Sequence, residues 1–170
     1  GGRLHGGALQ GASLPDGDLL VLDARGTVAR IDPGADPGHE RLILDLRDRV
    51  FRNREAGALA IAIHPRFGAA GSPGTRSFFL YYVATRDAER SQRVERISRF
   101  ELQDDPAAVR ASERILIEQL HVDQHSSSSP NKLNQHYGGG LRFGPDAYIY
   151  IGVGGAGAGD EIEHALRQPG

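Results

Sequence analysis

The chain has 170 residues, a formal net charge of −2, 39% hydrophobic residues and 25% charged residues. This composition is typical of a globular domain with an apolar core, and it gives no reason to expect nucleic acid or an anionic membrane as a partner. Cysteine is absent, which excludes disulfides and thiolate metal sites, and no apolar run approaches the roughly 20 residues that span a bilayer.

Short apolar runs separated by glycine-rich turns predict strands along the whole chain. In chain order the runs are residues 19–23, 27–32, 41–46, 59–63, 78–83, 94–100 and 115–117, followed by two strands within 135–154. Helical signals are few: Asp105 and Pro106 fit the cap and the first position of one helical turn. Residues 47–55 fit a short helix or a loop. The sequence therefore predicts an all-β, antiparallel fold.

A proline-centred turn recurs at Pro15, Pro65 and Pro145, each time between two apolar runs. Repeated four-stranded units of about 40–50 residues are typical of β-propeller blades, and an unrelated β-sandwich is the alternative. We expect blade 1 at about 8–50, blade 2 at about 56–120, a serine-rich loop at 121–135 and the start of blade 3 at about 136–170. Since a propeller closes with about 4–8 blades, these two and a half blades are expected to be the N-terminal portion of a larger domain.

The most informative motif runs through residues 135–154, where His136 stands next to Tyr137 and three glycines. A neutral imidazole accepts a proton near pH 7, so His136 is a candidate general base. A structural histidine that bonds a neighbouring blade is the alternative. Glu55 precedes the apolar strand of the second unit as His136 precedes that of the third. Both side chains are therefore expected to face one central cavity, unless Glu55 is a solvated loop residue.

Three other features are interpreted structurally. His64 ends an apolar strand, and we expect it to cap that strand and to pack under the following turn. His121 and His125 are four residues apart without a helical pattern, so a metal pair is not expected there. The glycine-rich residues 152–160 lack the Gly-Lys-Ser/Thr of a phosphate-binding loop, and a loop between strands accounts for them better.

Four ordered segments share their patterns with one protein family. They are residues 14–21 with 26–31, residues 55–67, residues 96–100 with 104–106 and 112–116, and His-Tyr-Gly-Gly-Gly-Leu-Arg-Phe-Gly-Pro-Asp from His136. Together they resemble the glucose/sorbosone dehydrogenase family, the soluble aldose dehydrogenases that use pyrroloquinoline quinone. The resemblance implies a six-bladed β-propeller with the quinone on its axial face.

The resemblance also implies an activity and a site for the intact protein. Hydride passes from C1 of an aldose sugar to the quinone, and an external acceptor then takes the electrons. His136 falls on the family's general base, while Glu55 and Gln135 fall on polar residues that line the sugar site. The residues that hold the quinone and calcium belong to later blades, so we expect no cofactor or metal ligands in this chain. A periplasmic or secreted location is implied as well.

The chain departs from the family pattern at Ala58, Ala60 and Ala147, and where Gly155-Ala156 replaces an Asp-Gly pair. These departures leave a second function open. It is that of a non-catalytic propeller that binds a protein or a glycan, as in hedgehog-interacting relatives. Retention of His136 favours the enzyme. By itself the 170-residue piece is expected to lack dehydrogenase activity and to associate through its open sheet edge.

Overall fold

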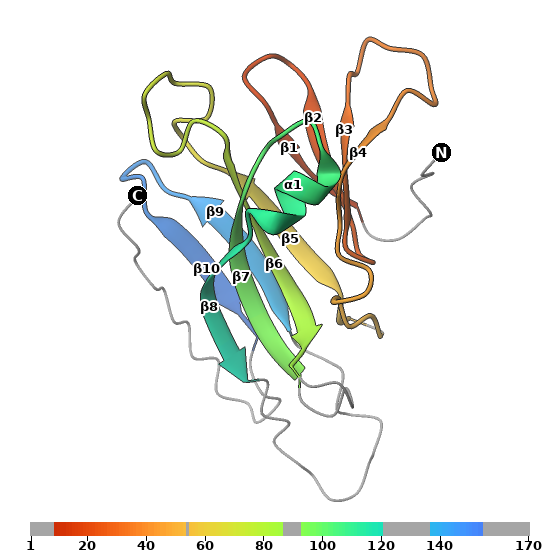
Figure 1. The fold of residues 1–170 in the computed structure, drawn as a ribbon. Coiled ribbons are helices and arrows are strands. Elements are labelled where there is room, and N and C mark those ends of the chain that lie inside the picture. The colour runs from red at the N-terminus through yellow and green to blue at the C-terminus, as the bar shows by residue number, and fades with distance from the viewer. Residues whose placement is uncertain (1–8, 54, 87–92, 121–136, 155–170) are drawn as a thin grey trace, which may run out of the picture.

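A computed structural model describes residues 9–53, 55–86, 93–120 and 137–154. In these ranges the chain forms ten strands and one short helix, arranged as three antiparallel sheets (Figure 1). The first sheet has the order β1 (Leu9–Ser13), β2 (Leu19–Asp23), β3 (Thr27–Ile31), β4 (Arg41–Asp45). The second has the order β5 (Ala58–Ile63), β6 (Ser77–Thr85), β7 (Arg93–Glu101), β8 (Arg114–Leu120). The third pairs β9 (Gly138–Phe143) with β10 (Ile149–Val153).

The predicted all-β, antiparallel fold is confirmed, with two differences in detail. Strand β1 (Leu9–Ser13) was not among the expected strands, because its sequence, Leu-Gln-Gly-Ala-Ser, carries no β-branched or aromatic residue. Residues 47–49 form a turn, so the loop alternative for this region holds and the short helix does not. Each four-stranded sheet is a simple meander in chain order, which is the strand pattern expected of propeller blades.

Strand β6 lies at the centre of the packing, and every residue from Ser77 to Ala84 is buried. Alternate side chains of a strand point to opposite faces of its sheet. Leu80 and Tyr82 accordingly join a cluster with the apolar side chains of the first sheet. Phe79 and Tyr81 join another cluster with side chains of β9 and β10. The second sheet is thus an inner layer with an apolar neighbour on each face.

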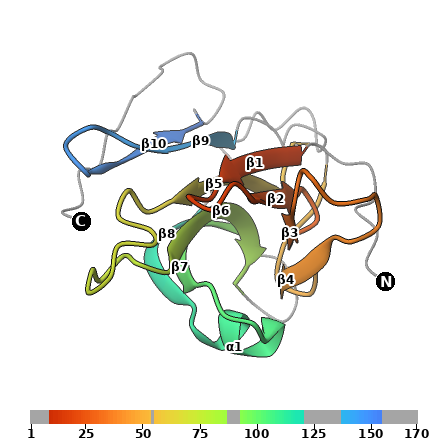
Figure 2. The same ribbon diagram turned by 90° about the horizontal axis from the view of Figure 1, so that it is seen from above.

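The first strands of the three sheets lie next to one another. Strand β5 contacts both β1 and β9, and the view from above shows these three strands gathered where the sheets converge (Figure 2). The later strands of the first two sheets spread outward from this line, and β8 is the outermost strand of the second sheet. The chain segments that enter β5 and β9 therefore meet at one end of the convergent strands.

The predicted short helix is present as α1 (Pro106–Ala111), in the connection between β7 and β8. The Asp105 side chain accepts a hydrogen bond from the Ala107 amide at 3.0 Å, and Pro106 occupies a position where the missing N–H costs nothing. Val109 anchors the helix, since it is fully buried against the core of the first two sheets. The one helix of the described ranges is neither long nor apolar enough to cross a membrane.

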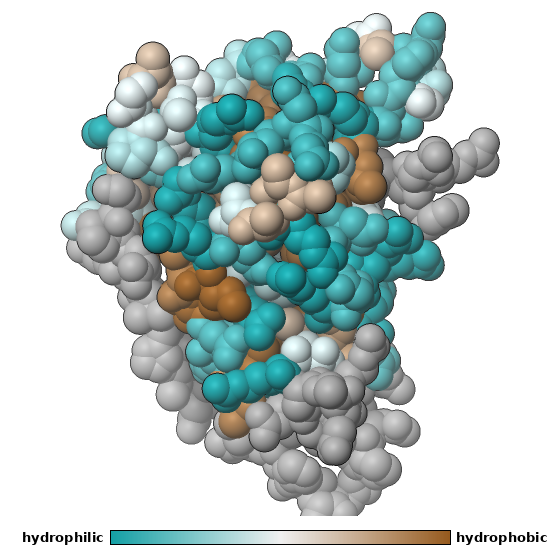
Figure 3. All heavy atoms as spheres, in the orientation of Figure 1, coloured by the Kyte–Doolittle hydropathy of each residue, from teal (hydrophilic) through white to brown (hydrophobic). Residues whose placement is uncertain are grey.

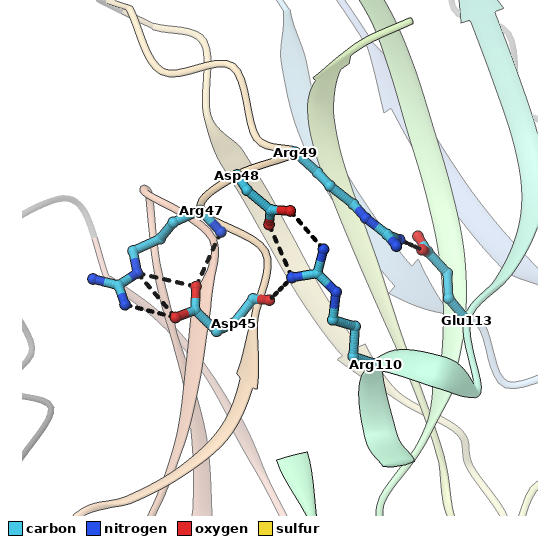
Figure 4. Close-up of polar contacts among 6 residues, drawn as sticks. All are labelled: Asp45, Arg47, Asp48, Arg49, Arg110 and Glu113. Carbon is cyan, nitrogen blue, oxygen red and sulfur yellow. Dashed lines mark hydrogen bonds and ion pairs between the residues drawn. The ribbon is translucent and has the colours of Figure 1, made fainter. Parts of the chain in front are cut away.

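Charged side chains join α1 and its flanking turn to the first sheet (Figure 4). Arg110 donates to the two carboxylate oxygens of Asp48 at 2.9 and 2.6 Å, and to the carbonyl oxygen of Asp45 at 2.7 Å. The bond from Arg110 holds the pKa of the Asp48 carboxyl below its usual range. Arg49 forms an ion pair with Glu113 beside it. These contacts join the end of β4 and the turn after it to α1 and Glu113.

Apolar side chains also reach the surface on β8. Ile115, Leu116 and Leu120 expose 48%, 43% and 45% of their surface. The space-filling view shows apolar atoms gathered in the region of this strand (Figure 3). The outer strand of the second sheet thus differs from β6, whose side chains are covered on both faces.

The first and third repeats share one turn geometry. In the first, the Gly17 amide donates to Leu14 and the Leu14 amide donates to Asp18 across the hairpin. In the third, the Ala147 amide makes the same bond to Gly144, at 3.0 Å. The residue whose amide donates this bond has a left-handed backbone in both turns, with φ of +98° at Gly17 and +63° at Ala147. An alanine there is strained, because its Cβ crowds the following carbonyl oxygen.

We predict that Ala147→Gly stabilises the protein by about 1 kcal/mol, because glycine removes this strain at a smaller entropic cost. The matched control is Gly17→Ala, which should destabilise by about 1 kcal/mol. A Cβ at Gly17 meets no atom within 4 Å, so no clash with a neighbouring group adds to the backbone strain there. Chemical denaturation of both variants checks the pair, and equal signs for the two changes would contradict the strain argument.

Candidate functional site

Two chain segments meet at the entry to the convergent strands. Ala56 precedes β5 and Tyr137 precedes β9, and both side chains are buried at 1% exposure in one cluster with Val83 of β6. Partly buried Phe51 and Leu59 pack against the same cluster. The starts of β5 and β9, far apart in sequence, are therefore held together around a shared apolar contact.

The three predicted site residues adjoin this cluster in sequence. Glu55 immediately precedes Ala56 and is exposed in the turn before β5. Gln135 and His136 lie outside the described residues, and Tyr137 is the neighbour through which they are linked to the cluster. The structure thus brings together the chain neighbours of Glu55 and His136, while the roles of all three residues stay predictions.

The glycines of the motif serve close backbone packing. A Cβ at Gly138, where φ is +78°, would lie 2.4 Å from the Gly152 carbonyl oxygen and 2.5 Å from the Gly154 amide nitrogen. Gly140 faces Gly152 across the β9–β10 pair, where a Cβ on either residue would make only ordinary contact, at 3.4 and 3.6 Å. The group that closely approaches Gly138 is therefore the backbone of β10 and of the residue after it.

Gly57 has a matching role at the other entry segment. A Cβ on Gly57 would lie 2.5 Å from the Ala24 carbonyl oxygen, which itself accepts the Ala58 amide at 2.8 Å. The Gly57 carbonyl in turn accepts the Val83 amide at 2.8 Å. The Glu55 segment is therefore tied by backbone bonds to the end of the first sheet and to β6.

A buried polar group lies directly beneath the entry of β9. The hydroxyl of Tyr81 on β6 is in hydrogen-bond contact with the Tyr137 carbonyl oxygen, at 2.7 Å, and with the Glu95 carboxylate on β7. Tyr81 is fully buried and Glu95 is 4% exposed. Burial raises the pKa of the Tyr81 phenol far above its usual value, and the charge of Glu95 and its hydrogen bond raise it further.

Sequence reasoning missed this group because nothing in the local pattern marks it. Tyr81 lies in a continuous apolar run, and β7 carries charged residues on both of its faces, Glu95 on one and Arg96 on the other. A strand with charged residues on both faces normally indicates that these side chains are solvated. The one available signal is a phenol inside a buried strand, since a buried tyrosine hydroxyl requires a polar partner.

His64 lies at the end of β5, and its contacts are those expected of a capping histidine. Its Nδ1 accepts the Arg66 amide at 3.0 Å, and its ring packs on Phe79 and Phe143 at centroid distances of 6.3 and 5.4 Å. A Cβ at Gly74 would overlap the ring, so a glycine is needed beside it. Burial lowers the pKa of His64, and the positive charges of Arg66 and Arg99 lower it further.

Among the described residues, the remaining candidates offer no second site. Within the described ranges, no group of three or more His, Asp or Glu side chains could hold a metal ion. His121 and His125 fall outside those ranges, as do residues 155–160 of the glycine-rich tail. An open hollow of about 600 Å³ lies between the end of β4 and α1, lined by Asp45, Arg47, Asp48, Pro106, Ala107 and Arg110. Its charged groups are engaged in ion pairs with one another.

Comparison with known proteins identifies one family. The family model described as Glucose / Sorbosone dehydrogenase matches residues 8–169. The uncharacterized protein slr1608 of Synechocystis sp. (strain ATCC 27184 / PCC 6803 / Kazusa) is 25% identical over 151 residues, which cover 86% of this chain and 32% of that protein. A structure solved as a candidate oxidoreductase (glucose dehydrogenase) of Thermus thermophilus superposes with a TM-score of 0.55 at 25% identity. That match covers 85% of this chain and 36% of the other.

The chain spans about a third of the length of both relatives. Its two four-stranded sheets and its β9–β10 pair therefore form part of a propeller, as the sequence predicts.

We predict that His64 becomes less stabilising as the pH falls. Its pKa in the folded protein lies below the ordinary value of 6.5, so the unfolded chain takes up a proton first and the free energy of unfolding declines as the pH falls through this region. His64→Asn keeps a polar side chain that does not titrate, so its melting temperature should vary less between about pH 7.5 and 5.5. Identical pH profiles for the two proteins would contradict the prediction.

Proposed function

Because this chain belongs to the glucose/sorbosone dehydrogenase family, we propose that the intact protein oxidises an aldose sugar at C1, with His136 as the general base. One observation carries the site assignment. Ala56 and Tyr137, the chain neighbours of Glu55 and His136, are buried in one cluster at the mouth of the convergent strands. Polar residues that precede β5 and β9 in the chain can therefore meet around one substrate.

The proposed chemistry assigns one task to each residue. Neutral His136 takes the proton of the anomeric hydroxyl while the hydrogen at C1 leaves with its electron pair, so the product is the lactone. Positioned bases of this kind contribute roughly 10²- to 10⁴-fold to a rate. Glu55 and Gln135 orient the sugar by hydrogen bonds to its hydroxyls, which reduces the freedom of the substrate before the proton moves.

Pyrroloquinoline quinone, when bound, supplies the acceptor for the hydride, and an external acceptor reoxidises it. Calcium is the expected companion ion. Among the described residues, no three acidic or histidine side chains form a cluster that could hold the calcium ion. As part of the same proposal, residues of later blades hold both the quinone and calcium. A periplasmic or secreted location is part of the same proposal.

The test is an assay of the intact protein with quinone, calcium, aldoses and a redox dye. We expect His136→Ala to lower the rate of dye reduction about 10²-fold or more. His64→Asn is the matched control, because it removes a histidine that packs on Phe79 and Phe143 at the far end of β5. It should keep most of the activity.

Two outcomes would reject the proposal. Undiminished activity of His136→Ala would remove the general base. Absence of quinone-dependent activity in the intact wild-type protein, with retained binding of a protein or glycan, would favour the non-catalytic binding module. The isolated 170 residues are expected to be inactive under the same conditions.

A further inference from the structure

The hydroxyl of Tyr81 links the core of the second sheet to the start of β9. It lies 2.7 Å from the carbonyl oxygen of Tyr137, the residue that follows His136, and it also contacts the Glu95 carboxylate. All three residues are at least 96% buried, so water does not compete for these bonds. A side chain of one sheet thereby holds the main chain of the next, one residue away from the proposed base.

The segment after Tyr137 begins with glycines. Gly138 and Gly139 both have left-handed backbones, with φ of +78° and +122°. Glycine accepts many backbone conformations at little steric cost, so the pairing of β9 with β10, and not their own preference, fixes these two residues. The position of Tyr137 is set instead by the burial of its ring against Ala56 and Val83, and by the bond that its carbonyl accepts from Tyr81.

Tyr82 shows that this contact is specific to one face of β6. Its hydroxyl is equally buried and also bonds a carboxylate, that of Glu113, at 2.5 Å. Burial and this bond raise the pKa of Tyr82 to about 12. The Tyr82 side chain belongs to the core shared with the first sheet and not to the β9 side. Both hydroxyls thus contact a carboxylate, and of the two tyrosines only Tyr81 reaches the entry of β9.

We infer that Tyr81, whose one hydroxyl proton is shared between the Tyr137 carbonyl oxygen and the Glu95 carboxylate, is a positioning residue that sets the main chain next to His136 for sugar oxidation. The inference rests on the proposed function, because it assumes that His136 is the base. Tyr81 does not contact substrate in this role. It acts by fixing the peptide that follows Tyr137, and a base displaced by about 1 Å loses up to about 10²-fold in rate.

The experiment compares Tyr81→Phe with Tyr82→Phe in the intact protein. Each variant removes one buried hydroxyl from a carboxylate and keeps the ring. We expect Tyr81→Phe to lower kcat about tenfold to a hundredfold with little change in KM, whereas Tyr82→Phe stays close to wild type. Glu95→Gln keeps the shape of the second partner and should lower kcat less than Tyr81→Phe does.

Amide hydrogen exchange gives a readout that does not depend on turnover. Loss of the Tyr81 bond should speed exchange in residues 137–141 about tenfold, and Tyr82→Phe should leave this segment unchanged. A purely structural role would lower the melting temperature of both variants alike without this local difference. Equal exchange in the two variants overturns the inference.

The two hypotheses fail separately. An active His136→Ala protein overturns the proposed function, and the catalytic role of Tyr81 with it. An inactive His136→Ala protein combined with a fully active Tyr81→Phe protein overturns only the inference about Tyr81.

Discussion

The arrangement depends on a sheet that must cover both of its faces. Strand β6 is buried from Ser77 to Ala84, so the second sheet is stable only between two apolar layers. The first sheet supplies one layer and the β9–β10 pair supplies the other. This requirement stacks consecutive sheets face to face and brings β1, β5 and β9 side by side. The meeting of the chain segments that enter β5 and β9 is thus a consequence of the burial of β6.

Each face of the second sheet also carries one buried phenol that bonds across to a neighbour. Tyr82 bonds Glu113, which pairs with Arg49 in the chain between the first two sheets, and Tyr81 bonds the Tyr137 carbonyl beside the third. Exposed ion pairs such as Arg110–Asp48 contribute little free energy. Apolar burial provides most of the stability, and these directional bonds determine how one sheet sits on the next.

Sequence reasoning succeeds for the fold where side-chain pattern and turn chemistry agree. The alternating runs from Leu19 onward predict the strands, and Asp105 with Pro106 predicts α1, because both signals are local. It misses β1, whose polar and small residues are kept in the sheet by pairing with β2. In this strand the tertiary partner, which no local pattern reveals, overrides a weak propensity.

The candidate site is predictable only in part, and the reason is physical. The glycines at the start of β9 mark a close approach, but the sequence does not say whether a ligand or the chain itself fills the space. At Gly138 the chain fills it, with the Gly152 carbonyl oxygen 2.4 Å from where a Cβ would lie.

The residue that holds the site in place is harder still to predict from the sequence, since Tyr81 and Tyr82 are adjacent aromatic residues in one buried run. What separates them is which face of β6 each occupies, and therefore which neighbouring sheet its hydroxyl reaches. That assignment is made by the stacking of whole sheets, so a candidate catalytic segment and the residue that orients it can lie 56 positions apart in the chain.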